Sequence, residues 1–446
     1  MRFRTAAALT GALALSLVSG CAGGGGAGSS ANTVTYWLWD TNQLPAYRAC
    51  AEDFEKRNPG LDVKISQMGW DDYWTKLTAS FIAGTQPDVF TDHIQKFGQF
   101  ADLKVLEPLD DLDIEDSDYQ PGLAASWLGE DGHRYGVPKD WDTVALFYNE
   151  KMAKDAGLSA GELGGLSWNP RDGGTFEKAV AHLTVDEKGR RGDEPGFDKD
   201  NVEVYGLATN GGGDGDGQTT WSHFAASAGW TYTDKERWGT EYRYDDDTFQ
   251  SMIEWYFGLA DKGYMAPFTD YSVSNQANAQ VAAGKAATAF DGAWMLSTYA
   301  GFEGVDFATA VTPAGPTGKR ATMMNGLADS VTKDARNKPG ALKWVKYLAS
   351  EECQRTVGGY GIVFPATPGG TEAAVAAYEE KGIDVTAFTR PVDDKENFRT
   401  FSYPITNYAA DVQALMRPAM QDVYGGGKPV SGLDETNDQI NLILDQ

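Results

Sequence analysis

The stretch TVTYWLWDTNQLPAYRACAEDFEKRNPGLDVKISQ (residues 33–67), continued by MGWDDYWTKLTASFIAGTQPDVFTDH (residues 68–93), decides the fold. Val34–Trp39 is dense in β-branched and aromatic residues and Leu61–Ile65 alternates, so both predict strands. Pro45–Arg57 and Asp71–Ala83 show the apolar spacing of helices. Pro87–Phe90 predicts a third strand. This β-α-β-α-β order indicates an α/β fold with parallel strands, right-handed crossovers and helices on both sheet faces.

Polar and aromatic residues follow two of these strands. The loop Trp39–Gln43 comes after the first strand, and Thr91–His93 comes after the third. Ligands of parallel α/β sheets bind beyond the carboxyl ends of the strands. We therefore expect these two loops to lie at the binding edge of the sheet.

The N-terminus predicts an export signal. Two arginines among the first four residues precede the apolar run Ala6–Val18, which is too short to span a bilayer, and small residues then precede Cys21. A cysteine at this position resembles the lipobox of bacterial lipoproteins, whose thiol receives a diacylglyceryl group. We predict a signal peptide at 1–20, and a lipidated Cys21 with a flexible tether at 21–32. The alternative is an ordinary secreted protein in which Cys21 is incidental.

Length and charge narrow the class of protein. The chain has 446 residues, 41% of them hydrophobic, which predicts a globular body of two or three domains. Its net charge of −26 argues against nucleic acid as a partner and against adsorption to anionic headgroups. The four histidines are scattered without a His/Cys cluster, so we expect no metal site and no cofactor.

The cysteines leave one question open. Once Cys21 is acylated, Cys50 and Cys353 remain, and an oxidising exterior permits a disulfide between them. Both lie in helix-like segments, where small buried thiols are also common. The sequence alone does not decide between a bridge and two buried thiols.

A Gly/Asp-rich loop spans Asn210–Gly217. Asp214 and Asp216 could bind calcium, but no later glutamate follows at EF-hand spacing. We therefore expect a flexible surface loop.

An ordered set of short patterns resembles the large extracellular carbohydrate-binding family of solute-binding proteins, which is maltodextrin-binding-like and serves ATP-binding-cassette sugar importers. The match covers nearly the whole mature chain. The patterns that carry it are Val34–Trp39, Phe54–Gly60, Ala83–Val89, Tyr135–Pro138, Ala145–Asn149, Ala283–Ala287, Gly292–Trp294, Ala341–Leu348 and Gly361–Pro365.

The resemblance implies two α/β lobes, each a mainly parallel sheet flanked by helices, joined by two or three crossing segments and closing by hinge bending. We assign residues 33–143 plus 286–330 to lobe 1, and residues 144–285 plus 331–446 to lobe 2. The implied partners are a sugar ligand and a membrane permease, and the implied state is a monomer.

Candidate ligand-binding residues follow from sugar chemistry. Aromatic rings stack on the C–H faces of a sugar, and short polar side chains bond its hydroxyls, most strongly when the acceptor is a carboxylate. Such residues occur on loops at predicted strand ends and helix starts. The residues that fit are Trp39, Asp40, Trp70, Tyr73, Asp92, Asp140, Trp141, Trp230, Asp291, Trp294 and Asn325.

Several of these candidates have a structural alternative. Asp40 could cap a helix, and Asp291 could do so beside a buried Trp294. Trp230 stands where many relatives have a second glycine, which puts that contact in doubt.

Two other functions compete with a sugar receptor. A membrane-tethered glycoside hydrolase or lyase would also need an aromatic cleft with paired carboxylates. A receptor of the same fold could instead bind peptides, glycerol phosphates or a metal complex. A phosphate ligand should place Arg or Lys in the cleft loops, whereas these loops are acidic and aromatic, with Lys139 as the main exception. The whole-chain resemblance favours a non-catalytic sugar receptor.

Overall fold

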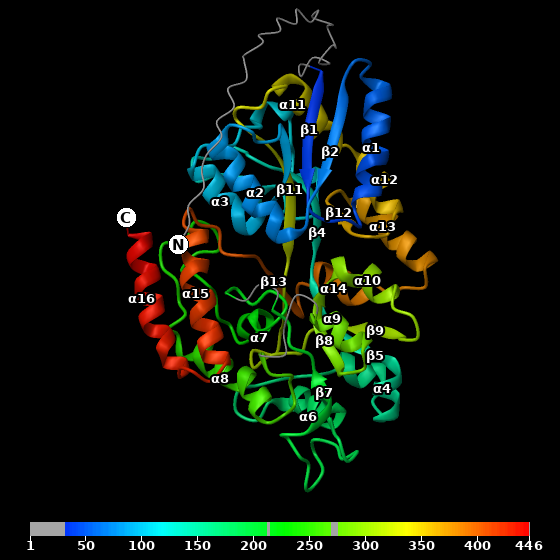
Figure 1. Ribbon diagram of the computed structural model, residues 1–446, viewed down its shortest axis with the longest axis vertical. Coiled ribbons are helices and arrows are strands. Elements are labelled where there is room, and N and C mark those ends of the chain that lie inside the picture. The colour runs from blue at the N-terminus through cyan, green and yellow to red at the C-terminus, as the bar shows by residue number, and fades with distance from the viewer. Residues whose placement is uncertain (1–31, 212–214, 269–274, 446) are drawn as a thin grey trace, which may run out of the picture.

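The computed structural model describes residues 32–211, 215–268 and 275–445. They form two lobes, one above the other in Figure 1. The signal peptide, Cys21 and the tether predicted at the N-terminus lie outside the described residues. Among the described residues, no helix combines the length and the apolar character that crossing a membrane requires.

The sheet of lobe 1 has six strands in the order β12-β4-β11-β3-β1-β2. β1 is parallel to β2 and β3, as predicted, whereas β11 is antiparallel to β3 and β4. The strands are β1 (Thr33–Leu38), β2 (Asp62–Gln67), β3 (Val89–His93), β4 (Val137–Asp142), β11 (Asn325–Val331) and β12 (Phe364–Pro365).

Helices cover both faces of this sheet, as the alternation predicted (Figure 1). On one face the rings of Tyr36, Tyr47 and Trp344 pack together, and on the other Phe90 packs on Phe100. The first face carries α1 (Leu44–Arg57), α11 (Lys338–Leu348), α12 (Glu351–Gly359) and α13 (Pro368–Glu380), and the second carries α2 (Trp70–Ala83) and α3 (Ile94–Asp102).

The sheet of lobe 2 has the order β6-β7-β8-β5-β9. Its strands are β5 (Val144–Asn149), β6 (Val185–Asp186), β7 (Val202–Leu207), β8 (Ala286–Gly292) and β9 (Phe307–Ala310). The helices that follow in this lobe are α4 (Glu150–Asp155), α5 (Ala160–Gly164), α6 (Gly174–Leu183), α7 (Ser222–Ser227), α8 (Asp247–Asp261), α9 (Ala277–Ala282), α10 (Leu296–Ala300), α14 (Thr386–Asp393), α15 (Ala409–Tyr424) and α16 (Leu433–Leu444).

Within the described residues the chain passes between the lobes at three places: from β4 to β5, from β9 to β11, and from α13 to α14. Beside the second passage, β10 (Arg320–Met323) pairs in parallel with β13 (Phe398–Phe401). Strands such as β3, β4 and β8 end at the side of their sheet that faces the other lobe. A strand that enters from the other lobe begins at that side, so it runs in the opposite direction. This explains why β5 and β11 are antiparallel to their neighbours.

The predicted lobe boundaries are wrong in two places. β8 and β9, within 286–330, belong to the sheet of lobe 2, because they pair with β7 and β5. Conversely β12 and helices α11–α13, within 331–446, belong to lobe 1. Periodicity identifies an element's type but carries no information about the strand with which it pairs.

The open question of the cysteines is answered by the structure. Cys50 on α1 and Cys353 on α12 form a disulfide, with their Cα atoms 5.5 Å apart. The bond joins two helices on the same face of the lobe 1 sheet. It links residues that are 303 positions apart in the chain.

Candidate functional site

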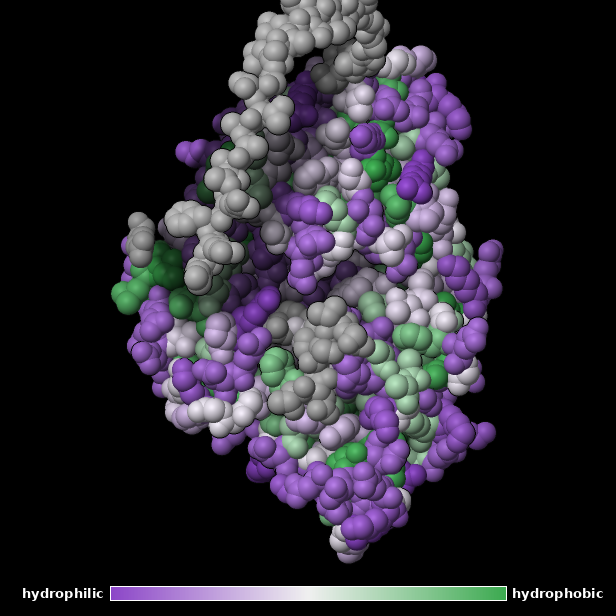
Figure 2. All heavy atoms as spheres, viewed as in Figure 1, coloured by the Kyte–Doolittle hydropathy of each residue, from purple (hydrophilic) through white to green (hydrophobic). Residues whose placement is uncertain are grey.

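The polar ends of the two sheets point toward each other across the crossing segments. In lobe 1, β1, β3 and β4 all end at this edge, where Trp39–Asp40, Asp92–His93 and Asp140–Asp142 stand. In lobe 2, β8 ends there, because Gly292 pairs with Val144 at the start of β5. We call these two sheet ends the facing edges. Figure 2 shows that the surface is hollowed between the lobes and is largely hydrophilic.

An aromatic cluster lies on the lobe 1 side. The ring of Trp39 is 5.1 Å from that of Trp70, and Trp70 is 5.4 Å from His93. Burial lowers the pKa of His93 to about 3, so this imidazole is neutral, and its Nδ1 accepts from Gln95 N at the start of α3. Trp70 is 41% exposed. The cluster therefore offers an accessible ring with a rigid, neutral support.

Three buried acceptor oxygens at the facing edges have no hydrogen-bond partner among the described residues: Asp140 Oδ2, Asp142 Oδ1 and Asn325 Oδ1. Asn325 lies opposite Asp142 in the sheet and donates from Nδ2 to Asp142 Oδ2 at 3.4 Å. Burial raises the pKa of Asp140 to about 7, and burial with the Asp140 charge raises that of Asp142. Leaving a buried polar atom unpaired costs about 1–3 kcal/mol, so these atoms favour a ligand that brings donors.

Lys139 does not supply those donors. Its Nζ donates to the Tyr36 hydroxyl and to Thr91 Oγ1, both at 3.0 Å, and lies 3.7 Å from the Tyr47 ring centroid. Burial lowers its pKa, against the opposing charges of Asp329, Asp140 and Asp40. The main cation that the sequence placed in these loops is therefore turned into the core of lobe 1.

On the lobe 2 side, Asp291 and Trp294 both lie at the end of β8. Asp291 accepts from Gly292 N at 3.0 Å and from the Tyr299 hydroxyl at 3.4 Å, and burial raises its pKa to about 7. The Trp294 ring lies over Gly292, where an added Cβ would come within 1.8 Å of it. The glycine thus sets the position of the indole. Asp291 bonds locally but caps neither η5 (Ala293–Met295) nor α10, so the capping alternative does not hold.

A family model described as bacterial extracellular solute-binding protein matches residues 49–382. The chain belongs to this family. A putative binding protein of Brucella abortus is 25% identical over 419 residues, which cover 90% of each chain.

Two solved structures show the same fold. The Listeria monocytogenes ABC substrate-binding protein Lmo0181, in complex with cycloalternan, has a TM-score of 0.76 at 19% identity and covers 93% of this chain and 99% of that chain. The GacH receptor of Streptomyces glaucescens, solved unliganded and with acarbose, has a TM-score of 0.74 at 22% identity and covers 93% and 98%.

Two of the predicted site residues of this solute-binding protein are core residues instead. Tyr73 is fully buried, and its hydroxyl donates to Thr91 O at 2.7 Å. Trp141 donates from Nε1 to Thr371 Oγ1 at 3.0 Å and stacks on Phe364. Their predictions as ligand contacts are corrected, because both rings face into lobe 1.

Three further candidates are bonded to groups of the protein, and one of them lies away from the facing edges. Asp40 accepts from Asn42 N at 2.8 Å within the turn before α1, and it does not cap that helix, whose N-cap is Gln43. Asp92 is fully buried and accepts from His93 N at 2.8 Å. Trp230 donates to Arg243 O at 2.7 Å and stacks on Phe249, away from the facing edges.

The structure adds a polar contact between the lobes that the sequence did not predict. Gln95 of α3 donates to Asp216 at 2.5 Å. Asp216 is buried, with its pKa raised to about 6 by burial, so the predicted surface loop is buried at this end. Residues 212–214, including the proposed calcium ligand Asp214, lie outside the described residues. Within the described part, no three His, Cys, Asp or Glu side chains are grouped to hold a metal ion.

The buried Asp92 predicts a pH dependence of stability. Burial raises its pKa from 3.8 to about 8, so between these values the folded state binds more protons than the unfolded state and stability falls as pH rises. We expect the melting temperature of Asp92→Asn to rise relative to that of the wild type as pH increases from about 4 to 8.

Asp186→Asn provides a control of opposite sign. Although burial raises its pKa, hydrogen bonds from Arg190 and Asp198 N hold the pKa of Asp186 at about 2. The stability that this carboxylate adds is present above about pH 4 and is lost toward pH 2. A difference in melting temperature between Asp92→Asn and wild type that stays constant from pH 4 to 8 would contradict the burial argument.

Proposed function

We propose that this solute-binding protein captures a mono- or oligosaccharide between the facing edges and delivers it unchanged to the permease of an ATP-binding-cassette importer. The observation that carries the proposal is the set of unpartnered buried acceptors on Asp140, Asp142 and Asn325, close to accessible aromatic rings. Sugar hydroxyls would pair these oxygens, and the rings of Trp39, Trp70 and Trp294 would stack on C–H faces.

The ligands of two solved relatives support a sugar. Cycloalternan and acarbose are the molecules bound to Lmo0181 and to the GacH receptor. An anionic ligand is disfavoured here, because the facing edges present carboxylates while Lys139 is bonded within lobe 1.

We further propose that the mature protein is a monomer anchored through a lipid on Cys21 at the extracytoplasmic face of the membrane. The position of Cys21 after the export signal supports this. Mass spectrometry of the N-terminal peptide from the membrane fraction should find a diacylglyceryl-modified Cys21. An unmodified Cys21 in secreted protein would contradict the anchor.

Calorimetric titration of the purified protein with a panel of neutral sugars tests the function. We expect saturable binding, and chromatography of the same samples should recover each sugar intact. Release of a shorter glycan or of an altered sugar would favour the hydrolase or lyase instead.

Trp70→Ala should weaken binding of the preferred sugar up to about tenfold, because an aromatic contact contributes about 0.5–1.5 kcal/mol beyond area burial. Ile82→Ala is a control on the same helix, since Ile82 is 87% exposed at the opposite end of α2 from Trp70. Equal affinities of the two variants would remove Trp70 from the site.

A further inference from the structure

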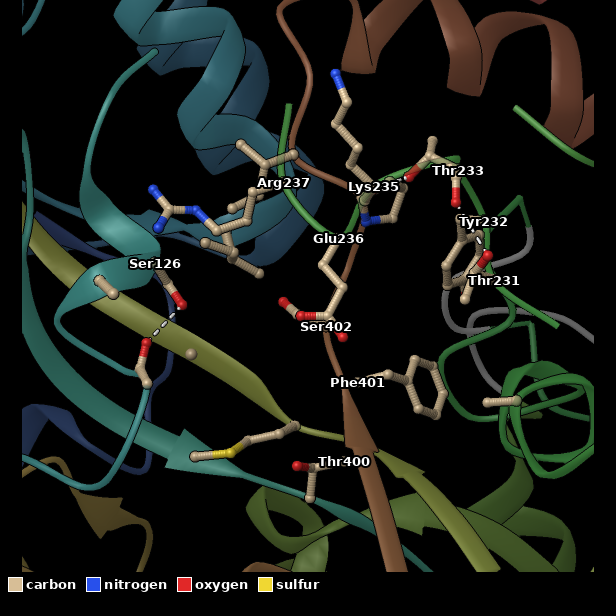
Figure 3. A pocket seen from close by; sticks show the side chains of 18 of the residues that line it. Ser126, Thr231, Tyr232, Thr233, Lys235, Glu236, Arg237, Thr400, Phe401 and Ser402 are labelled. Carbon is tan, nitrogen blue, oxygen red and sulfur yellow. Dashed lines mark hydrogen bonds between the residues drawn. The ribbon is translucent and has the colours of Figure 1, made fainter. Parts of the chain in front are cut away.

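A second cavity lies between the lobes, beside the β10–β13 pair. Its volume is about 340 Å³, and Figure 3 shows it from close by. Lobe 1 contributes residues 121–126, lobe 2 contributes loop 230–237 and segment 399–405, and Met324 and Gly326 come from the second crossing segment. We call it the hinge cavity.

The hinge cavity is separate from the facing edges. Segment 401–405 stands between them: Ser402 and Pro404 line the cavity, whereas Tyr403 between them does not. The Tyr403 ring lies 5.3 Å from His93, and its hydroxyl donates to Gln218 at 2.7 Å. Phe401 and Ile405 also line the cavity, so Tyr403 is the residue of this segment that is turned the other way, toward His93 at the facing edges.

Hydroxyl groups line much of the hinge cavity. Ser126 donates to Gly122 O at 2.9 Å, Thr231 to Thr233 O at 2.9 Å, and Thr233 to Lys235 O at 2.6 Å. Each of these hydroxyls uses its proton on a backbone oxygen and keeps lone pairs for a donor from a ligand.

The lining holds one carboxylate, Glu236, and three cations, which are Lys235, Arg237 and Arg399. In Figure 3 the carboxylate of Glu236 points into the space, while the Lys235 amine points away from it. Arg237 donates from Nη2 to Leu128 O at 2.9 Å, and its buried Nε has no partner within the described residues. Arg399 Nη1 likewise donates to two backbone oxygens, those of Ala226 at 3.2 Å and Trp230 at 3.1 Å. Glu236 is therefore the ionic group aimed into the space, which disfavours an anion and suits groups that donate hydrogen bonds.

An aromatic wall completes the cavity. Phe401 is half-buried, its ring centroid lies 6.4 Å from that of Tyr232, and Trp230 is also part of the lining. Trp230 was predicted from sequence to bind ligand, and it stands here and not at the facing edges. A ring-shaped ligand can stack on Phe401 while its polar groups face the hydroxyls and Glu236.

The loop that carries Glu236 and Arg237 is held in an unusual conformation. Trp238 has φ 52°, in the left-handed region that L side chains rarely adopt. Its backbone N donates to Ile405 O at 3.0 Å, which fixes the loop to the segment that lines the cavity. The two ionic side chains are thus held over the cavity by a strained backbone.

We propose that the hinge cavity is a second binding site, for a neutral cyclic polyol of mono- or disaccharide size. The volume is at the lower end of small-molecule sites, and the lining combines one aromatic wall with hydroxyls, a carboxylate and a guanidinium N–H. The proposal does not depend on which ligand occupies the facing edges.

The test is calorimetric titration of the full protein with glucose, galactose, mannose, maltose, trehalose and lactose. Wild type should show two binding events, in one isotherm or with two different sugars. Glu236→Ala should weaken one event at least tenfold without unfolding, because this side chain is exposed, and Ser402→Trp should abolish the same event by filling the cavity. Ser431→Trp on the exposed η6 turn (Val430–Gly432) is the control for the added indole.

The other event should respond to Asp142→Ala and not to the cavity variants. Isotherms that are unchanged in both Glu236→Ala and Ser402→Trp would overturn the hinge-cavity proposal while leaving the sugar receptor intact. If the cavity variants lose all binding while Asp142→Ala binds like wild type, the hinge cavity is supported and the site at the facing edges is overturned. A wild type that binds none of the six sugars would overturn the hinge-cavity proposal.

Discussion

Asp142→Ala is expected to weaken sugar binding about 100-fold. Asp142 is buried at the first crossing segment, and its Oδ1 has no partner among the described residues. The truncation leaves a donor of the ligand buried and unpaired, which costs about 1–3 kcal/mol, and the upper value corresponds to roughly 100-fold in affinity. Titration calorimetry at neutral pH measures the change directly.

Two variants complete this experiment. Asp142→Asn keeps one acceptor oxygen and the size of the side chain, so it should lose less affinity than the alanine variant. Asp111→Ala removes an exposed carboxylate of lobe 1 and controls for the change in net charge. An affinity for the preferred sugar that is the same in Asp142→Ala and wild type would place the ligand elsewhere.

Removing the disulfide by Cys50→Ser with Cys353→Ser is expected to lower the free energy of unfolding of lobe 1 by about 2–5 kcal/mol. The bond closes a loop of 303 positions, and long loops have the most conformational entropy in the unfolded chain. Scanning calorimetry should show a melting temperature lower by about 5–15 °C.

The same bond supports the facing edge through α12. Gln354, next to Cys353, donates to Lys139 O at 3.1 Å on β4. Reductant should lower the melting temperature of wild type to that of the double variant and leave the double variant unchanged. Equal melting temperatures of wild type with and without reductant would show that the packing of α1 on α12 suffices.

Local patterns predicted the first half of lobe 1 well. The strands β1–β3 and helices α1 and α2 lie where spacing placed them, within a few residues at their ends. Gly84, directly after the predicted helix Asp71–Ala83, has φ 65° and is the C-cap of α2. These features depend on near neighbours in the chain, so the sequence contains the information they need.

The candidate site could be predicted only in part. The sequence indicated which strand ends carry polar residues, and Asp140 and Asn325 are indeed among the buried acceptors. The prediction named Asp140 and Trp141 but missed Asp142, whose Oδ1 is one of the unpartnered acceptors. A period-two count along β4 would have placed Asp140 and Asp142 together, on the side opposite Trp141.

By itself, the sequence determined the α/β class, the acidic character of the chain and the strand ends that carry polar and aromatic residues. Tertiary structure alone decided which strands share a sheet, that Cys50 meets Cys353, and that Tyr73 and Trp141 are buried. The reason is physical: periodicity reports on each element's own buried face, whereas strand partners and lobe membership depend on contacts between residues far apart in the chain.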